Sequence, residues 1–202
     1  MQNKFKNKYR ISSARLQSWD YSNNGAYFIT ICTQNRNHFF GKIQNQEMHL
    51  SEIGKLAEKY WLEIPEYFPF VEVGSFVVMP NHFHGILIIN KLNIDSTVET
   101  RFIASVNNDG VDDQNKTRLI VSLPGKMGGF SADNNPMLTD SISKIIRWYK
   151  GRCSFECRKL DPNFGWQSRF HDHIIRNANA FVNIQNYIAN NPAKWKEDTF
   201  WK

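Results

Sequence analysis

The chain has 202 residues, of which 41% are apolar and 14% aromatic, and its formal net charge is +6. This length suits one domain, or one domain with an insertion, and the apolar content excludes a wholly disordered chain. The sequence has no apolar run of about 18 residues, which argues against a transmembrane helix. The basic N-terminus lacks the apolar segment of a secretory signal. Three cysteines are too few for a disulfide framework and favour a reducing compartment.

The first part of the chain predicts a strand, a hairpin and a helix in that order. Residues 26–33 are β-branched and aromatic, which is typical of a buried strand. Residues 37–50 predict a turn followed by a hairpin-like stretch. Ser51 is positioned to cap an amphipathic helix, because apolar residues recur at spacings of three and four over residues 53–64. Pro65 lies near the end of this helix.

The middle of the chain predicts two strands followed by an insertion. Residues 71–80 and 82–90 have strand composition, and the turn Met79-Pro80-Asn81 between them favours an antiparallel pair. Residues 91–136 are rich in Asn, Asp, Ser and Gly, and we interpret them as an inserted or mobile loop, with a short apolar run at 119–123.

The last part of the chain predicts a helix, a strand and a second helix. Helical periodicity starts near Thr139 or Ser141, a strand follows at 168–176, and a helix over 177–191 ends at Pro192. Without the insertion and the last helix, the order is βαββαβ. We therefore predict one α+β domain over residues 1–202 with a ferredoxin-like antiparallel sheet, helices on one of its faces, and an additional C-terminal helix.

Two groups of cations carry the positive excess. Residues 1–15 contain five cations and no acid, whereas residues 144–159 contain six cations and only Glu156 as an acid. Such surfaces attract polyanions, and nucleic acid is the commonest one. A solvated helix face explains the second group equally well.

Two pairs of side chains offer chemistry. His82 and His84 are two residues apart on a strand, so their imidazoles share one face and could hold a metal ion together. Two histidines on a solvated face are the plainer alternative. Tyr187 and Asn191 are four residues apart on the last helix and share a face. A half-buried core tyrosine and a helix C-cap explain this second pair as simply.

A second His-x-His pattern competes as a metal site. His171 and His173 also lie two residues apart on a strand, and Cys153 and Cys157 complete a formal Cys₂His₂ set. The single residue between the histidines is wrong for a zinc finger. We therefore expect the two cysteines to pack on one face of the basic helix.

Three segments in this order resemble the HUH single-tyrosine transposases, particularly the REP-associated tyrosine transposases. They are MPNHFHGILII (79–89), WQSRFHDHIIRN (166–177) and YIANNP (187–192). The resemblance implies that His82 and His84 are the HUH pair, that Asn191 is the third ligand of Mg²⁺ or Mn²⁺, and that Tyr187 is the nucleophile. It implies that His173 and Arg176 support the site or the DNA.

The resemblance also implies an activity and its partners. Such an enzyme cleaves and rejoins single-stranded or hairpin DNA through a 5′-phosphotyrosine intermediate in the bacterial cytoplasm, where it associates with the nucleoid when bound to DNA. It leaves open a homodimer with shared active sites and implies no membrane partner. The alternatives are a relaxase-like nickase, an inactive or host-adapted nucleic-acid-binding module, and a metalloenzyme that uses the second histidine pair. The expected DNA-binding residues are Arg10, Arg15, Lys144, Arg147, Lys150, Arg169 and Arg176.

Overall fold

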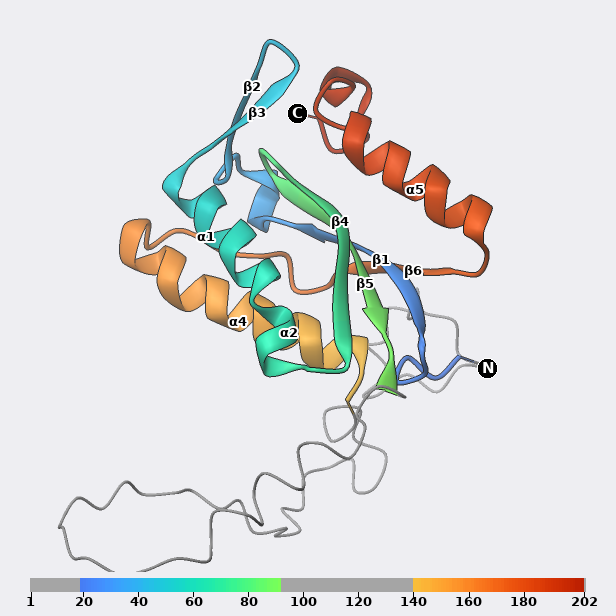
Figure 1. Ribbon diagram of the computed structural model, residues 1–202. Helices are drawn as coiled ribbons and strands as arrows, with labels where there is room; N and C mark the ends of the chain where they lie inside the picture. The colour runs from blue at the N-terminus through green and yellow to red at the C-terminus, as the bar shows by residue number, and fades with distance from the viewer. Residues whose placement is uncertain (1–18, 92–139, 202) are drawn as a thin grey trace, which may run out of the picture.

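The computed structural model of the protein describes residues 19–91 and 140–201 (Figure 1). The predicted insertion at 91–136 lies outside the described residues apart from Lys91, as do Arg10 and Arg15. None of the helices in the described ranges is both long enough and apolar enough to cross a membrane.

A four-stranded antiparallel sheet forms the centre of the molecule. It contains β1 (Gly25–Cys32), β4 (Val71–Met79), β5 (His82–Ile89) and β6 (His171–Ile175), in the order β4-β5-β1-β6. Strands β4 and β5 are consecutive and form an antiparallel hairpin, whereas β1 pairs with β5 on one side and with β6 on the other. This is the ferredoxin-like arrangement that the sequence predicts, so the predicted fold class is confirmed.

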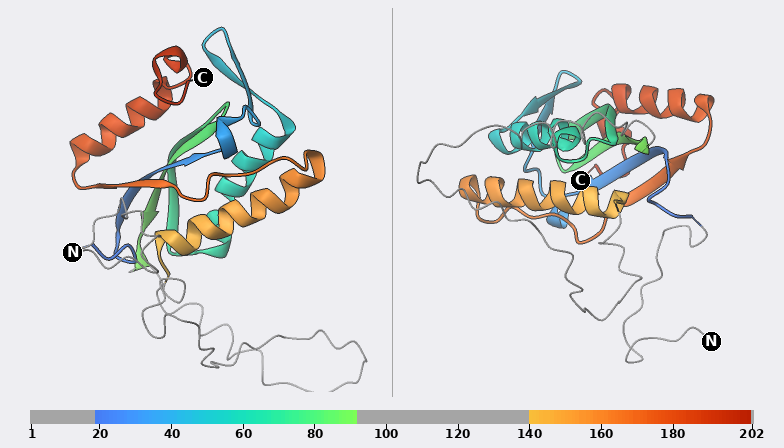
Figure 2. Two further views of the ribbon diagram at one scale, coloured as in Figure 1. Left: turned by 180° about the vertical axis from the view of Figure 1, so that it is seen from behind. Right: turned by 60° about the horizontal axis from the view of Figure 1, so that its bottom comes forward.

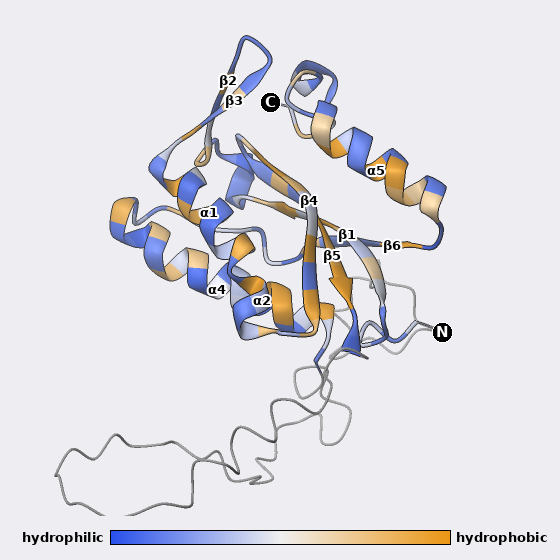
Figure 3. Cartoon of the chain, in the orientation of Figure 1, coloured by the Kyte–Doolittle hydropathy of each residue, from blue (hydrophilic) through white to orange (hydrophobic). Residues whose placement is uncertain are grey.

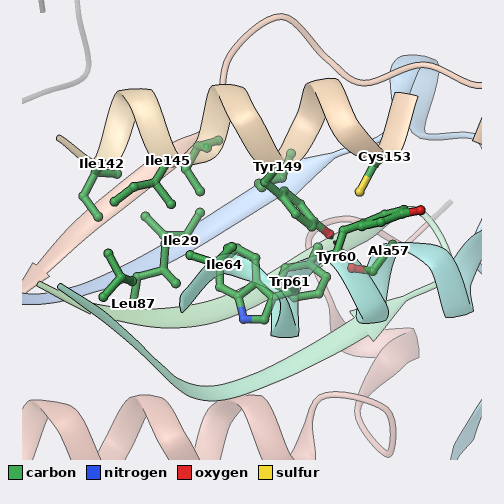
Figure 4. Packing of buried hydrophobic residues seen from close by; sticks show 14 of the residues in the cluster. Ile29, Ala57, Tyr60, Trp61, Ile64, Leu87, Ile142, Ile145, Tyr149 and Cys153 are labelled. Carbon is green, nitrogen blue, oxygen red and sulfur yellow. Dashed lines mark hydrogen bonds between the residues drawn. The ribbon is translucent and has the colours of Figure 1, made fainter. Parts of the chain in front are cut away.

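Two helices cover one face of this sheet. They are α1 (Glu52–Leu62) and α4 (Ile142–Leu160), and the short α2 (Ile64–Tyr67) follows α1 (Figures 1 and 4). Helix α1 begins where predicted, since the Ser51 hydroxyl accepts a hydrogen bond from the Gly54 amide at 3.1 Å. Apolar side chains from both helices meet those of the strands. Figure 3 shows hydrophobic residues along much of β5 and a mixture of hydrophobic and hydrophilic residues on β4 and on the helices.

The interior of this layer is large and aromatic. Trp61 of α1, Tyr149 of α4 and Phe83 of β5 are fully buried against one another, with ring centroids 4.5 to 5.8 Å apart. Cys153 and Cys157 are also fully buried in this core, as expected for the inner face of α4. Burial raises the pKa of the Cys157 thiol to about 12, so this side chain behaves as a small apolar group.

The opposite face of the sheet carries α5 (Ala178–Asn190), which packs mainly on β4 (Figure 2). The Asn177 side chain caps α5 by accepting a hydrogen bond from the Ala180 amide at 2.8 Å. A small cluster of buried residues, Ile86, Ile175 and Ile188, joins the helix to the sheet. The chain then makes a 3₁₀ turn, η5 (Trp195–Glu197), and its last described residues return toward β5.

Two further elements flank the sheet at the end of β1. A 3₁₀ turn, η2 (Gln34–Arg36), follows β1 directly, and a two-stranded hairpin of β2 (Gly41–Gln44) and β3 (Glu47–Leu50) comes next. The hairpin confirms the prediction for residues 37–50 and projects beside the C-terminal end of the described chain (Figure 1).

Candidate active site

The strand β5 directs His82 and His84 toward α5 and directs Phe83 into the aromatic core. The alternation follows from strand geometry, in which side chains i and i+2 share a face. Both imidazoles are buried, with exposures of 0% and 1%, and their ring centroids lie 4.5 Å apart. The predicted pairing of these histidines on one face is therefore present, and the face is enclosed rather than solvated.

Neighbouring polar side chains orient the two imidazoles. The Asn81 side-chain oxygen lies 2.9 Å from His82 Nδ1, while the Asn81 amide nitrogen donates to the Phe200 carbonyl at 2.9 Å. Since the Asn81 oxygen can only accept, His82 carries its proton on Nδ1 and presents an unprotonated Nε2. The Thr30 hydroxyl lies 2.8 Å from Nδ1 of His84, and this hydrogen bond orients the second imidazole.

Helix α5 places the Tyr187 hydroxyl 3.2 Å from His84 Nε2. Phe28 of β1 supports both groups, because its ring stacks on the His84 ring at 5.2 Å and meets the Tyr187 ring edge-on at 6.0 Å. Tyr187 is 44% exposed, so its hydroxyl is anchored in the site while part of the ring remains accessible. All of these groups come from one chain, so a second subunit is not needed to complete this cluster.

Asp198 joins the site from the segment after η5, and the sequence did not predict it. Its Oδ2 lies 3.1 Å from the Asn191 amide nitrogen, 3.5 Å from the Tyr187 hydroxyl and 3.9 Å from His82 Nε2. One ligand atom from each of His82, His84 and Asp198 lies within 4.8 Å of the others. Asp198 falls six residues beyond Pro192, in a stretch with no helix or strand periodicity, so no sequence pattern marked it.

Two buried polar atoms of the site have no hydrogen-bond partner among the described residues. They are Nε2 of His82 and Oδ1 of Asn191. Buried polar atoms are normally satisfied, and an orphaned one calls for an explanation such as an ion. An imidazole nitrogen and an amide oxygen with free lone pairs, beside a carboxylate, form a donor set that fits a divalent cation.

Burial also fixes the protonation states of the site. Desolvation, followed by the neighbouring His84, lowers the pKa of His82 to about 2, and desolvation lowers the pKa of His84 to about 4. Both imidazoles are therefore neutral at neutral pH, as metal ligands must be. Desolvation and then the Asp198 charge raise the pKa of Tyr187 above its usual value, so its hydroxyl keeps its proton in this arrangement.

The end of the described chain lies over the two imidazoles. The Phe200 ring is 4.6 Å from the His82 ring and 5.9 Å from the His84 ring, measured between centroids. The Arg36 guanidinium lies 5.1 Å from the same Phe200 ring and donates to the Thr199 carbonyl at 3.2 Å. The segment 198–200 thus connects the site to η2.

The second histidine pair takes no part in this cluster. His171 and His173 are exposed on β6. Among the described residues, no group of three or more His, Cys, Asp or Glu side chains that could hold a metal ion includes them. His173 and Arg176 instead line a cavity of about 440 Å³ at the open edge of β6, together with Tyr21 and Asn177. The predicted supporting roles of His173 and Arg176 remain predictions.

The predicted DNA-binding cations of α4 differ in their surroundings. Lys144 is exposed and paired with Asp140 at 2.7 Å. Lys150 donates to the carbonyls of Gln167 and Arg169 at 2.5 and 3.5 Å, and burial lowers its pKa to about 8, so it ties α4 to the following loop. Arg147 and Arg169 have exposed side chains.

Comparisons with known proteins give one close relative and a shared fold. No model of a known protein family matches the chain. An uncharacterised protein of Haemophilus influenzae is 34% identical over 191 residues, which cover 94% of this chain and 92% of that protein. A REP-associated tyrosine transposase bound to a REP hairpin superposes with a TM-score of 0.52 at 20% identity, over 92% of this chain and 74% of that chain. A candidate transposase from Deinococcus radiodurans R1 gives a TM-score of 0.42 at 12% identity, over 88% and 97% of the two chains.

Proposed function

We propose that this chain, which belongs to one family with the Haemophilus influenzae protein and has the fold of a REP-associated tyrosine transposase, is a DNA-cleaving and DNA-joining enzyme. It would act on single-stranded or hairpin DNA through a 5′-phosphotyrosine intermediate. One observation carries the proposal: the Tyr187 hydroxyl meets a buried pair of neutral imidazoles whose remaining neighbours are an orphaned amide oxygen and a carboxylate. The REP hairpin bound by the structural neighbour is the reason to choose hairpin DNA as the first substrate.

The proposed reaction exchanges one phosphodiester for another. The Tyr187 oxygen forms a bond to phosphorus, and the bond from phosphorus to the 3′ oxygen breaks. The phenol gives up its proton and the leaving oxygen gains one, so the products are a 5′-phosphotyrosine and a free 3′-hydroxyl. Because one ester replaces another, the reverse attack by a 3′-hydroxyl rejoins DNA without an external energy source.

The residues of the site fit a divalent metal such as Mg²⁺ or Mn²⁺. His82 and His84 would hold it through Nε2, with Asn191 through its side-chain oxygen and Asp198 through its carboxylate. Such an ion supplies positive charge to a non-bridging phosphate oxygen. The protein keeps both imidazoles neutral by burial and fixes their orientation through Asn81 and Thr30.

A covalent-capture experiment tests the proposal. The full chain is incubated with Mn²⁺ and a pool of labelled hairpin oligonucleotides with randomised single-stranded flanks, and protein–DNA adducts are separated on a denaturing gel and sequenced. We expect the wild type to form an adduct and the Tyr187→Phe variant to form none. Tyr67→Phe is the matched control, because Tyr67 is a 54% exposed tyrosine on α2 outside the site.

The outcomes separate the two main classes of function. An adduct that survives in Tyr187→Phe would show that another residue is the nucleophile. DNA binding by the wild type without any adduct would favour a nucleic-acid-binding module of the same fold. Adduct formation and DNA binding are measured on the same protein preparations.

We also propose that α4 contributes to DNA binding through Lys144 and Arg147. Each phosphate contact that is lost should reduce the salt dependence of single-stranded DNA binding by a slope of about 0.7. The variant Lys144→Gln/Arg147→Gln should therefore lower the slope of log K against log salt concentration by about 1.4. Lys55→Gln on α1, a helix that carries none of the predicted DNA-binding cations, serves as the control. An unchanged slope in the double variant would exclude this face.

A further inference from the structure

We propose that Arg36 is a DNA-positioning residue whose guanidinium binds a phosphodiester of the cleaved strand within one nucleotide of the bond that Tyr187 attacks. This inference rests on the proposed function. It adds a DNA contact from a residue that lies outside the three segments in which the sequence resembles the transposases. It follows from how the η2 turn is built, how it is tied to the histidine strand, and which partners the guanidinium lacks.

The backbone of η2 adopts a conformation that L-residues avoid. Asn35 and Arg36 are consecutive residues with φ angles of 56° and 58°. Asparagine tolerates the left-handed region, whereas a long side chain such as arginine gains nothing from it. Non-glycine residues in this region are uncommon, and such residues concentrate at functional sites. The two residues form the centre of a turn in which the Asn37 amide donates to the Gln34 carbonyl at 3.2 Å. The Arg36 side chain that leaves this turn lies against the segment over the site.

Hydrogen bonds fix this turn to the strand that carries the histidines. The Thr33 amide and hydroxyl both donate to the Asn81 carbonyl, each at 2.9 Å, and the Gln34 amide donates to the Gly165 carbonyl at 2.7 Å. Asn81 is the residue that orients His82. The base of Arg36 is therefore held in a fixed relation to the site, as required of a group that positions a substrate.

The guanidinium lies beside the site and keeps donors to spare. It contacts the Phe200 ring, which in turn contacts the His82 ring. An arginine has five N–H donors, and the structure records one hydrogen bond, to the Thr199 carbonyl. A phosphate oxygen is a charged and stronger acceptor than a backbone carbonyl, so DNA can engage the remaining donors or take the place of Thr199.

The charge of Arg36 has no carboxylate partner among the described residues. Other cations of the chain do: Lys144 pairs with Asp140, and Arg152 and Lys159 pair with Glu156. An arginine that is positioned by a tethered turn, lies near a reaction site and lacks a carboxylate is suited to a phosphate, which guanidinium groups recognise in a bidentate manner.

Methylphosphonate substitution tests the inference directly. The oligonucleotide recovered by covalent capture is synthesised with a single neutral methylphosphonate at the attacked phosphate or at either neighbouring phosphate, and adduct formation is measured under single-turnover conditions. With the unmodified DNA, we expect Arg36→Gln to slow adduct formation by about 100-fold, as removal of a fixed charge-stabilising donor does in other enzymes. Arg36→Lys should recover part of this loss.

The decisive comparison is between the effect of Arg36→Gln on unmodified DNA and its effect on DNA that carries one methylphosphonate. With the methylphosphonate at one of the three positions, the wild type and Arg36→Gln should differ by less than threefold, because the charge that Arg36 binds has been removed. Arg152→Gln is the matched control, since Arg152 is exposed on α4 and paired with Glu156. Thermal melts of both variants identify any loss of folding.

Two results would overturn the inference while leaving the proposed function intact. In the first, Arg36→Gln forms the adduct at the wild-type rate. In the second, it loses the same factor on all three modified DNAs as on the unmodified strand, which would mean that Arg36 acts only by holding the protein together. If the wild type forms no adduct with any DNA, the proposed function fails and this inference fails with it.

Discussion

Both faces of the central sheet contain buried side chains, but along β5 the two faces differ in chemistry. On the face covered by α1 and α4, Phe83, Trp61 and Tyr149 belong to one apolar core. Figure 4 shows Trp61 and Tyr149 among the side chains of this core. On the face covered by α5, the same strand presents His82 and His84, each with an exposure of 1% or less. Burial of Phe83 therefore stabilises the fold, whereas burial of the neighbouring imidazoles of His82 and His84 destabilises it.

Along β5, the residues that stabilise the fold and the residues that carry the proposed chemistry therefore lie on opposite faces of the sheet. Apolar burial on the first face contributes roughly 25 cal/mol per Å² to folding. On the second face, buried polar groups such as His82 Nε2 and Asn191 Oδ1 are left without partners among the described residues, and each such group costs about 1–3 kcal/mol. Burial on the apolar face can offset that cost. Three measurements of the free energy of unfolding test whether the two faces contribute differently to stability.

The largest effect is expected from Trp61→Ala on the apolar face. Removing a fully buried indole should lower the free energy of unfolding by about 3–5 kcal/mol through lost burial and a cavity. Trp61→Phe should cost much less, because it keeps most of the ring and removes an indole N–H that has no partner among the described residues. Urea unfolding measures both values, and Val182→Ala, at a 51% exposed position on α5, is the neutral control. If Trp61→Ala and Trp61→Phe lowered the free energy of unfolding equally, this account of the core would be contradicted.

The second effect concerns metal and the polar face. If the cluster holds a cation, free Mn²⁺ at about 100 times its dissociation constant should stabilise the wild type by about 2.7 kcal/mol. Asp198→Asn removes the only charged member of the cluster, so at the same concentration the gain should fall to roughly half or less. Tyr187→Phe should retain the gain, because the hydroxyl is not a proposed ligand. An identical Mn²⁺ effect in Asp198→Asn would remove Asp198 from the ligand set.

The third and smallest effect is a pH dependence that originates on the polar face. The folded pKa values of His82 and His84 are lowered to about 2 and 4, against 6.5 for an ordinary histidine. Below pH 6.5 the unfolded chain therefore binds more protons than the folded chain, and the free energy of unfolding falls as the pH falls. Two histidines should account for about 2 kcal/mol between pH 6 and pH 5.

Urea titrations in the presence of EDTA measure this dependence without bound metal. His84→Gln should remove about half of the change between pH 6 and pH 5, since one of the two titrating groups is gone. A pH dependence that is the same in the wild type and in His84→Gln would show that these imidazoles are not the groups that destabilise the fold in mild acid.

Local patterns predicted most of the fold. The helix over 52–62 was predictable from its apolar spacing and from Ser51, and the hairpin at 41–50 and the helix ending before Pro192 were equally clear. The His-x-His pair was predictable as a shared face, because alternation along a strand needs no information from elsewhere in the chain. The burial of that face was not predictable, since it depends on where α5 packs.

Asp198, Asn81 and Arg36 show what sequence patterns miss. Asp198 follows an irregular turn, Asn81 occupies what the sequence shows only as a turn residue, and Arg36 owes its direction to a left-handed backbone that no local preference favours. Each residue acquires its place through contacts with segments far away in the chain: Asp198 with Asn191 and Tyr187, and Asn81 and Arg36 with the segment at 199–200.

The order of strands and helices, the ferredoxin-like class and the identity of the paired histidines could all be predicted from the amino-acid sequence, because they depend on periodicities of two and of 3.6 residues. Other features of the site became visible in the folded chain alone. They are the contact of the Tyr187 hydroxyl with His84, the neutral imidazoles, and the carboxylate and arginine that lie beside them from separate segments. Hydrogen bonding, desolvation and charge act over a few ångströms in space, whatever the separation along the chain.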